Sequence, residues 1–209
     1  WNPRDGQEMA VAPTDMHRID YAKVNRPHYY EYVSGDATIV GEKEHFLFAA
    51  IVDVLGHGRE AHELAVEIEK FLVAYWDGSV VELMDRLQNH LAGTRGAGAG
   101  LCLVDRYSGV LRYAGIGNTV IRRFGSSEAR LLSRAGIIGG SRRTPREEKM
   151  TLTPGDIVLL YTDGVKDRFQ LQDYPQLLHH TAELIARTVI QRFGKDHDDA
   201  SCIALRYER

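Results

Sequence analysis

The stretch around Asp53 constrains the fold of this chain more than any other, because it joins a buried strand to a helix through an acid and two glycines. Residues 46–52 form a short apolar run with aromatic and β-branched side chains, which is typical of a buried strand. Asp53 ends the run, Gly56 and Gly58 allow a tight turn, and residues 59–76 repeat apolar side chains at helical spacing. A carboxylate so placed either binds a hard cation or merely helps the helix begin.

Composition excludes several classes of function. The 209 residues fit one domain, 1–209, in which we find no internal repeat, low-complexity tract or linker. A formal net charge of −3 gives no electrostatic case for nucleic acid or an anionic membrane, and no apolar run approaches the roughly 20 residues of a spanning helix. Cys102 and Cys202 both lie in apolar, strand-like contexts, which favours buried thiols over a disulfide. We therefore expect a cytoplasmic protein that binds neither nucleic acid nor membrane.

The remaining chain alternates strand-like runs with turn residues. Strands are predicted at 15–24, 28–33, 37–41, 45–52, 101–105, 110–115, 119–124, 147–152, 157–161 and 202–207. Helices are predicted at 59–76, 79–91 and 177–193, the second with Ser79 as its N-cap. The glycine-rich residues 93–100 lack the Gly-Lys-Ser/Thr ending of a phosphate-binding loop. Short strands with hairpin-length links indicate antiparallel sheets.

Four acids share one kind of position, since each stands where a predicted strand meets a turn. They are Asp36, Asp53, Asp163 and Asp198. Any one alone is an ordinary turn residue, but four together indicate convergence on one site. Carboxylates gathered closely repel one another unless cations neutralise them, and an all-oxygen ligand set selects Mg²⁺ or Mn²⁺ over zinc. Two such ions can activate a water and clamp a phosphoryl group during in-line attack.

The order and spacing of four motifs resemble those of the metal-dependent, PPM-type serine/threonine phosphatases, and in particular the SpoIIE branch. The motifs are Ser34-Gly-Asp36, Asp53-Val-Leu-Gly-His-Gly58, Tyr161-Thr-Asp-Gly164 and Asp198-Asp-Ala-Ser201. The resemblance runs from about residue 33 to 206. Two further segments, Gly93-Thr-Arg-Gly-Ala97 and Gly115-Ile-Gly-Asn118, are more narrowly similar to the phosphatases that reset the stressosome.

The resemblance implies an α+β fold, an α-β-β-α sandwich of two stacked antiparallel sheets flanked by helices. It implies two divalent cations, Mn²⁺ or Mg²⁺, both bridged by Asp53. Asp163 and Asp198 would complete the first site, while Asp36 and the backbone carbonyl of Val54 would serve the second. Asp53, Asp163 and Asp198 would be the catalytic acids in hydrolysis of phosphoserine or phosphothreonine by a metal-bridging hydroxide. Phosphorylated STAS-type stressosome scaffold proteins would be the partners. The alternative is a catalytically weak or inactive phosphatase-like module that docks on a signalling complex.

The sequence departs from the family pattern at three places. Val54 stands where Gly is usual, which a carbonyl ligand tolerates if the backbone angle is ordinary. Ser201 stands where Thr is commoner. Many relatives carry a phosphate-binding Arg shortly before the first metal acid, but here Tyr30 and Tyr32 occupy that neighbourhood, and Arg26 lies farther back.

Other residues are therefore candidates for contacting the substrate. Arg95 carries a planar fork that can hold two phosphoryl oxygens, although it alternatively packs at a helix end and pairs with a nearby acid. Asn118 is either a substrate contact or a turn residue. His57 is either an acid near the leaving group or a structural residue at the helix start. Asp199 either supports its loop, binds metal through water, or caps the turn.

Overall fold

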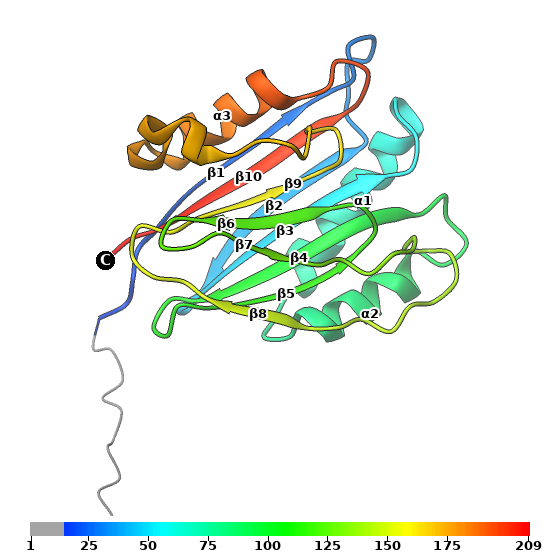
Figure 1. The fold of residues 1–209 in the computed structure, drawn as a ribbon. Helices are drawn as coiled ribbons and strands as arrows, with labels where there is room; N and C mark the ends of the chain where they lie inside the picture. Colours follow the sequence, from blue (N-terminus) through cyan, green and yellow to red (C-terminus); the bar gives the residue numbers. More distant parts are fainter. Residues whose placement is uncertain (1–14) are drawn as a thin grey trace, which may run out of the picture.

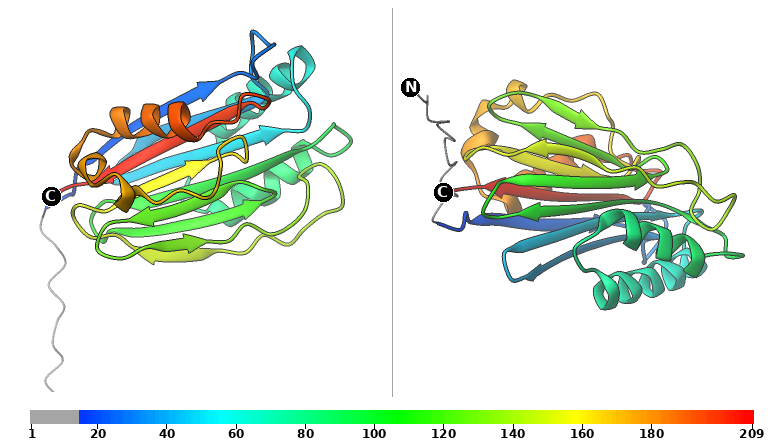
Figure 2. Two further views of the ribbon diagram at one scale, coloured as in Figure 1. Left: turned by 45° about the horizontal axis from the view of Figure 1, so that its top comes forward. Right: turned by 90° about the horizontal axis from the view of Figure 1, so that it is seen from below.

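Ten strands form two antiparallel sheets that stack face to face, with helices on the outer face of each sheet (Figures 1 and 2). This computed structural model describes residues 15–209, so the first fourteen residues of the predicted domain 1–209 lie outside the described residues. The layers confirm the expected α-β-β-α sandwich. No helix within residues 15–209 is long and apolar enough to cross a membrane.

Each sheet contains five strands. The first has the order β1 (Ile19–Arg26), β10 (Ala200–Tyr207), β9 (Ile157–Tyr161), β6 (Val120–Phe124) and β7 (Ala129–Leu131). The second has the order β2 (Asp36–Lys43), β3 (Phe46–Val54), β4 (Ala97–Asp105), β5 (Val110–Ile116) and β8 (Glu148–Thr151). All described pairings between these strands are antiparallel, as the short links predict.

Three hydrophobic clusters hold the layers together. The cluster between the sheets includes Leu47, Ile51 and Leu160, all of which are buried. A second cluster packs α1 (Arg59–Tyr75) and α2 (Val80–His90) onto the second sheet, and a third packs α3 (Ala182–Phe193) and the short 3₁₀ helices η1 (Leu171–Asp173) and η2 (Pro175–His179) onto the first. Burial on both faces explains why β3 and β4 are nearly continuous apolar runs.

The hairpin of β2 and β3 forms as the sequence predicts, and its register places two acids opposite each other. Asp36 pairs with Asp53 across the hairpin, and Asp53 pairs with Gly98 on β4. Opposed residues in antiparallel strands lie on the same face with their Cβ atoms about 5 Å apart. Ser79 also caps α2 as predicted, because its side chain accepts a hydrogen bond from the Glu82 amide.

Three expectations about secondary structure were wrong. The predicted strand 28–33 is a loop closed by a turn, in which the Glu31 amide donates to the His28 carbonyl. The predicted helix 177–193 is divided into η2 and α3. Thr181 is the N-cap of α3 and its side chain accepts a hydrogen bond from the Leu184 amide, while the Asp20 carboxylate accepts from the Ala182 amide. The predicted strand 101–105 begins earlier than expected, because residues 97–100 at the end of the glycine-rich segment also belong to β4.

Candidate active site

The four predicted acids come from strand ends that meet at one end of the sandwich. Asp36 begins β2 and Asp53 lies near the end of β3, both in the second sheet. Asp163 follows β9 and Asp198 precedes β10, which are neighbours in the first sheet. Stacking the two sheets therefore brings two pairs of acids together, although the pairs are distant in the sequence.

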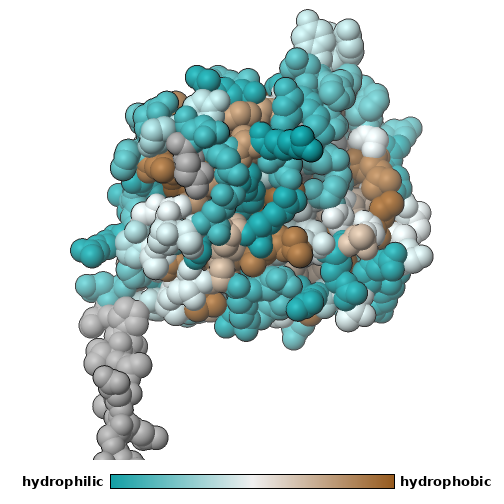
Figure 3. Space-filling model, in the orientation of Figure 1, coloured by the Kyte–Doolittle hydropathy of each residue, from teal (hydrophilic) through white to brown (hydrophobic). Residues whose placement is uncertain are grey.

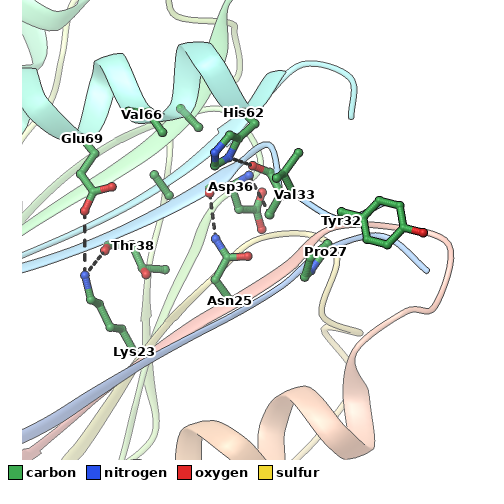
Figure 4. A pocket seen from close by; sticks show the side chains of 13 residues that line it. Lys23, Asn25, Pro27, Tyr32, Val33, Asp36, Thr38, His62, Val66 and Glu69 are labelled. Atoms are coloured by element: carbon green, nitrogen blue, oxygen red, sulfur yellow. Dashed lines mark hydrogen bonds and ion pairs between the residues drawn. The ribbon is translucent and has the colours of Figure 1, made fainter. Parts of the chain in front are cut away.

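A cavity of about 550 Å³ lies at this junction, and three of the four acids line it. Asp53, Asp163 and Asp198 share the lining with Asn118. Asp36 instead lines an adjacent cavity of about 320 Å³ between β1, β2 and α1, which is drawn in Figure 4. The structure thus brings Asp53, Asp163, Asp198 and Asn118 to one space and places Asp36 behind it.

Burial and the charge of neighbouring carboxylates raise the pKa of three of the four acids. Burial, followed by the charge of Asp163, raises the pKa of Asp53 to about 7. Burial and the charge of Asp163 also raise the pKa of Asp198, while burial and the charge of Asp53 raise that of Asp36 well above its ordinary value. For Asp36, Asp53 and Asp198, burial is the larger cause and a neighbouring carboxylate adds to it, as expected where a cation belongs.

The buried hydroxyl of Thr162 connects the two sheets at Asp36, and the direction of its bonds follows from the donors available. Thr162 Oγ1 accepts a hydrogen bond from the Ser201 amide at 3.1 Å, and it lies 2.8 Å from Asp36 Oδ2. The Thr162 hydroxyl donates to Oδ2 of Asp36. Thr162 therefore fixes one oxygen of Asp36 as an acceptor. No motif in the sequence predicted this role of Thr162, although a hydroxyl beside Asp163 at the end of an apolar run was a visible signal.

Asn118 holds a carboxylate of the site. It lies in the turn between β5 and β6, and its Nδ2 donates to Asp163 Oδ2 at 2.7 Å. Gly98 makes room for it, since a Cβ there would lie 2.9 Å from Asn118 Oδ1. The side-chain amide of Asn118 therefore orients Asp163. A contact between Asn118 and substrate remains a prediction.

Asp199 supports a loop, as one of the predicted alternatives stated. Its two carboxylate oxygens accept hydrogen bonds from the amides of His28 and Gly35, each at 2.7 Å. His57 lies beside this loop, where its Nδ1 is 2.9 Å from Glu31 Oε1 and its ring stacks on His28 at 5.2 Å. Asp199 thus has both oxygens bound to backbone, and Glu31 orients His57.

The arginines considered for phosphate binding are both held by other groups. Arg95 donates to a carboxylate oxygen of Glu60 and, at 3.2 Å, to the Leu55 carbonyl, and it is not among the residues that line the acid-bearing cavity. This is the arrangement of the alternative interpretation, in which Arg95 pairs with a nearby acid. Arg26 donates to the Lys195 carbonyl and to Asp196, which precede Asp198 in the chain.

Substitution of Arg95 tests the two interpretations. Because Arg95→Ala removes an ion pair and a hydrogen bond to the Leu55 carbonyl, we expect a loss of about 1 kcal/mol and a melting temperature lower by about 2–4 °C. A role in phosphate binding also requires slower turnover of both p-nitrophenyl phosphate and a phosphoprotein. Glu60→Gln is the matched control, since it removes the ion pair and keeps the arginine. Unchanged kinetics on both substrates would exclude Arg95 from the site.

The donor set fits divalent cations even though its side chains do not close into a cage. Within residues 15–209, no three His, Cys, Asp or Glu side chains converge as a preformed metal site. The donors around the cavity are nevertheless carboxylate oxygens that repel one another, which is the chemistry of a Mg²⁺ or Mn²⁺ site. Val54 is compatible with the carbonyl role, because its backbone angle φ is negative, as is ordinary for a residue with a side chain. Among residues 15–209, Glu44 is the one non-glycine residue with a positive φ.

Comparisons with known proteins point to one family. The family model described as Stage II sporulation protein E (SpoIIE) matches residues 43–208. Among solved structures, a chain from work on the bacterial stressosome as a modular system adapted to control secondary messenger signalling is 27% identical, with a TM-score of 0.84, and the match covers 90% of this chain and 100% of that one. No curated protein matches by sequence.

Two further structures share the fold at lower identity. RsbX in complex with magnesium is 18% identical with a TM-score of 0.78, and the match covers 95% of this chain and 99% of that chain. The PP2C phosphatase domain of SpoIIE from Bacillus subtilis, with a fragment of its regulatory domain, is 20% identical with a TM-score of 0.74, covering 92% of this chain and 64% of that one.

Proposed function

The chain belongs to the SpoIIE family, a branch of the PPM-type protein serine/threonine phosphatases, and on that premise we propose that it dephosphorylates a stressosome scaffold protein. The family match confirms the resemblance expected from the sequence. The narrower substrate, a phosphorylated STAS-type scaffold protein in the cytoplasm, is supported by the likeness to a stressosome-related chain and to RsbX.

The observation that supports this proposal best is the convergence of Asp53, Asp163 and Asp198 on one cavity. Asp53 would contact both cations, Asp163 and Asp198 would complete the first site, and Asp36 with the Val54 carbonyl would serve the second. When bound, the cations supply Lewis-acid activation of water and compensate the negative charge of the phosphoryl group.

The protein's own residues position these groups. Asn118 orients Asp163. The Thr162 hydroxyl binds Oδ2 of Asp36, so the other oxygen of this carboxylate is not bound by Thr162. Asp199 holds the loop that begins beside the cavity at His28. A phosphorylated side chain that enters the cavity therefore contacts acids and a rim that are already held in place. This lowers the entropic cost of orienting the phosphoryl group.

The competing function is a phosphatase-like module that docks on a signalling complex without turnover. Retention of all four acids favours the enzyme. Phosphate release from a serine-phosphorylated STAS domain, with Mn²⁺ and then with excess chelator, separates the two. We expect release only with Mn²⁺. Tight binding of the phosphorylated domain without any phosphate release would favour the docking module instead.

Divalent cations should also stabilise the fold. A cation that binds only the native state stabilises it by about 2.7 kcal/mol at one hundred times its dissociation constant. For a domain of this size we expect the melting temperature to rise by about 5–10 °C with Mn²⁺, measured by differential scanning fluorimetry. Asp163→Asn and Asp198→Asn should reduce the rise, because each removes a ligand charge.

The matched control for that measurement is Glu183→Gln on α3, whose carboxylate pairs with Arg187 instead of facing the cavity. It should retain the full rise. An identical melting temperature with and without millimolar Mn²⁺, together with activity under chelator, would show that the acids are structural.

A further inference from the structure

Three tyrosines stand in solvent on the loop between β1 and β2, and nothing in the hydrophobic clusters accounts for them. Tyr29, Tyr30 and Tyr32 are 76%, 82% and 99% exposed, whereas large aromatic side chains are usually highly buried. The loop, residues 27–35, projects at the top of Figure 1 and forms the protrusion at the top of Figure 3. We call it the tyrosine loop.

Both ends of the tyrosine loop are fixed to the start of β10. Buried Asp199 accepts from the amides of His28 and Gly35 through different oxygens, each at 2.7 Å, and the Tyr29 amide donates to the Asp196 carbonyl at 3.1 Å. Three hydrogen bonds thus hold the two ends of the loop to the segment that leads into β10. The rings are therefore presented on an ordered stem, which reduces the entropy that a partner must remove on binding.

The tyrosine loop stands at the rim of the acid-lined cavity. His28 lines that cavity together with His57, and Glu31 pairs with His57 across the rim. Tyr32 is among the residues that line the adjacent cavity containing Asp36, and its ring is directed away from Asp36 (Figure 4). A protein whose phosphorylated side chain reaches Asp53 passes this rim, so the surface around that side chain comes close to the tyrosine loop.

We propose that the tyrosine loop is a docking surface for the folded surface that surrounds the phosphorylated residue of the substrate protein. The inference rests on the proposed phosphatase function and adds where the partner is recognised. Tyrosine rings supply rigid contact area and their hydroxyls supply hydrogen bonds, so the matching partner surface presents aliphatic side chains and backbone carbonyls. The loop contains no Lys or Arg, which gives no electrostatic case for an anionic membrane as its occupant.

The test compares a folded substrate with small ones. The variant replaces Tyr29, Tyr30 and Tyr32 together with Ser, and the substrates are a serine-phosphorylated STAS domain, the phosphopeptide cut from it, and p-nitrophenyl phosphate. Because aromatic anchors dominate protein interfaces, we expect kcat/KM on the folded domain to fall at least about tenfold, mainly through KM. The two small substrates should change less than about twofold, and the melting temperature should hold.

A binding measurement makes the test independent of turnover. In the Asp53→Asn background, the triple substitution should weaken the affinity for the phosphorylated domain by at least about tenfold in calorimetry. The control is Tyr107→Ser. Tyr107 is also exposed, but it lies just after the end of β4, whereas Gly98, which neighbours the acids, lies near the start of that strand. It should leave both measurements unchanged.

Three results would overturn the inference. Equal losses on all three substrates would mean that the loop shapes the cavity, and unchanged binding of the folded domain would mean that it docks nothing. A wild-type dimer that the substitutions dissociate, seen by light scattering, would assign the loop to a second copy of the chain. Absence of hydrolysis by the wild type would instead contradict the proposed function, and the binding measurement would still decide the role of the loop.

Discussion

Asp53→Asn is expected to abolish turnover while leaving the fold intact. The amide has nearly the shape of the carboxylate but cannot neutralise cations. We therefore expect kcat to fall by at least about 10³-fold, which is the upper end of the loss seen when one group that stabilises transition-state charge is removed. Without metal, the variant should melt no lower than the wild type. Burial and repulsion from Asp163 already penalise the ionised acid, and the neutral amide escapes both costs.

The measurement is phosphate release from a phosphopeptide in Mn²⁺, with melting curves in chelator. Asp85→Asn is the matched control, because Asp85 lies on α2, where it pairs with Arg142. It should keep wild-type activity. Hydrolysis at a near wild-type rate by a verified Asp53→Asn protein would refute the assignment of the site.

Gly164→Ala is expected to cause the largest loss of stability among simple substitutions near the site. A Cβ at position 164 would lie 1.7 Å from the Asp199 carbonyl oxygen and 3.0 Å from the Ala200 Cα. These are backbone atoms at the start of β10, so no side-chain rotation relieves the clash. We expect a loss of at least about 3 kcal/mol and a melting temperature lower by about 6–12 °C. Activity should fall as well, since the clash separates Asp163 from Asp198.

Gly78→Ala provides the comparison for that measurement. A Cβ at position 78 meets no atom within 4 Å, so this substitution should change the free energy of unfolding by less than about 0.5 kcal/mol. Denaturant unfolding of both variants reports the difference directly. Equal stability of the two variants would show that the Asp163 turn can move away from β10 at little cost.

Much of the fold follows from local sequence pattern. The hairpin of β2 and β3, the helical face of α1 and the Ser79 cap of α2 all form as predicted, because alternation, helical spacing and capping are short-range signals. The acids at strand ends were also visible. Their role as metal ligands, together with the substrate contacts of Arg95 and Asn118, remains a prediction.

The errors fall where tertiary contacts overrule local preference. The aromatic segment 28–33 has the composition of a strand, yet it finds no neighbouring strand and forms an exposed loop instead. Aromatic β-propensity reflects packing on a half-buried surface, and this segment has no such surface to cover. The start of α3 was also misplaced. Thr181 caps this helix locally, and the Asp20 carboxylate from β1, far away in the sequence, accepts a further hydrogen bond from the Ala182 amide.

The sequence by itself determined most of the strands, the first two helices and the placement of acids at strand ends, since these depend on neighbouring residues. Only the tertiary structure decided which acids share a cavity and what holds each one. Asp36 and Thr162 are 126 residues apart and bond across two sheets, and Asp199 reaches back across 171 and 164 residues to His28 and Gly35. Such bonds depend on how the sheets stack, a property of the whole packed chain that no local pattern encodes.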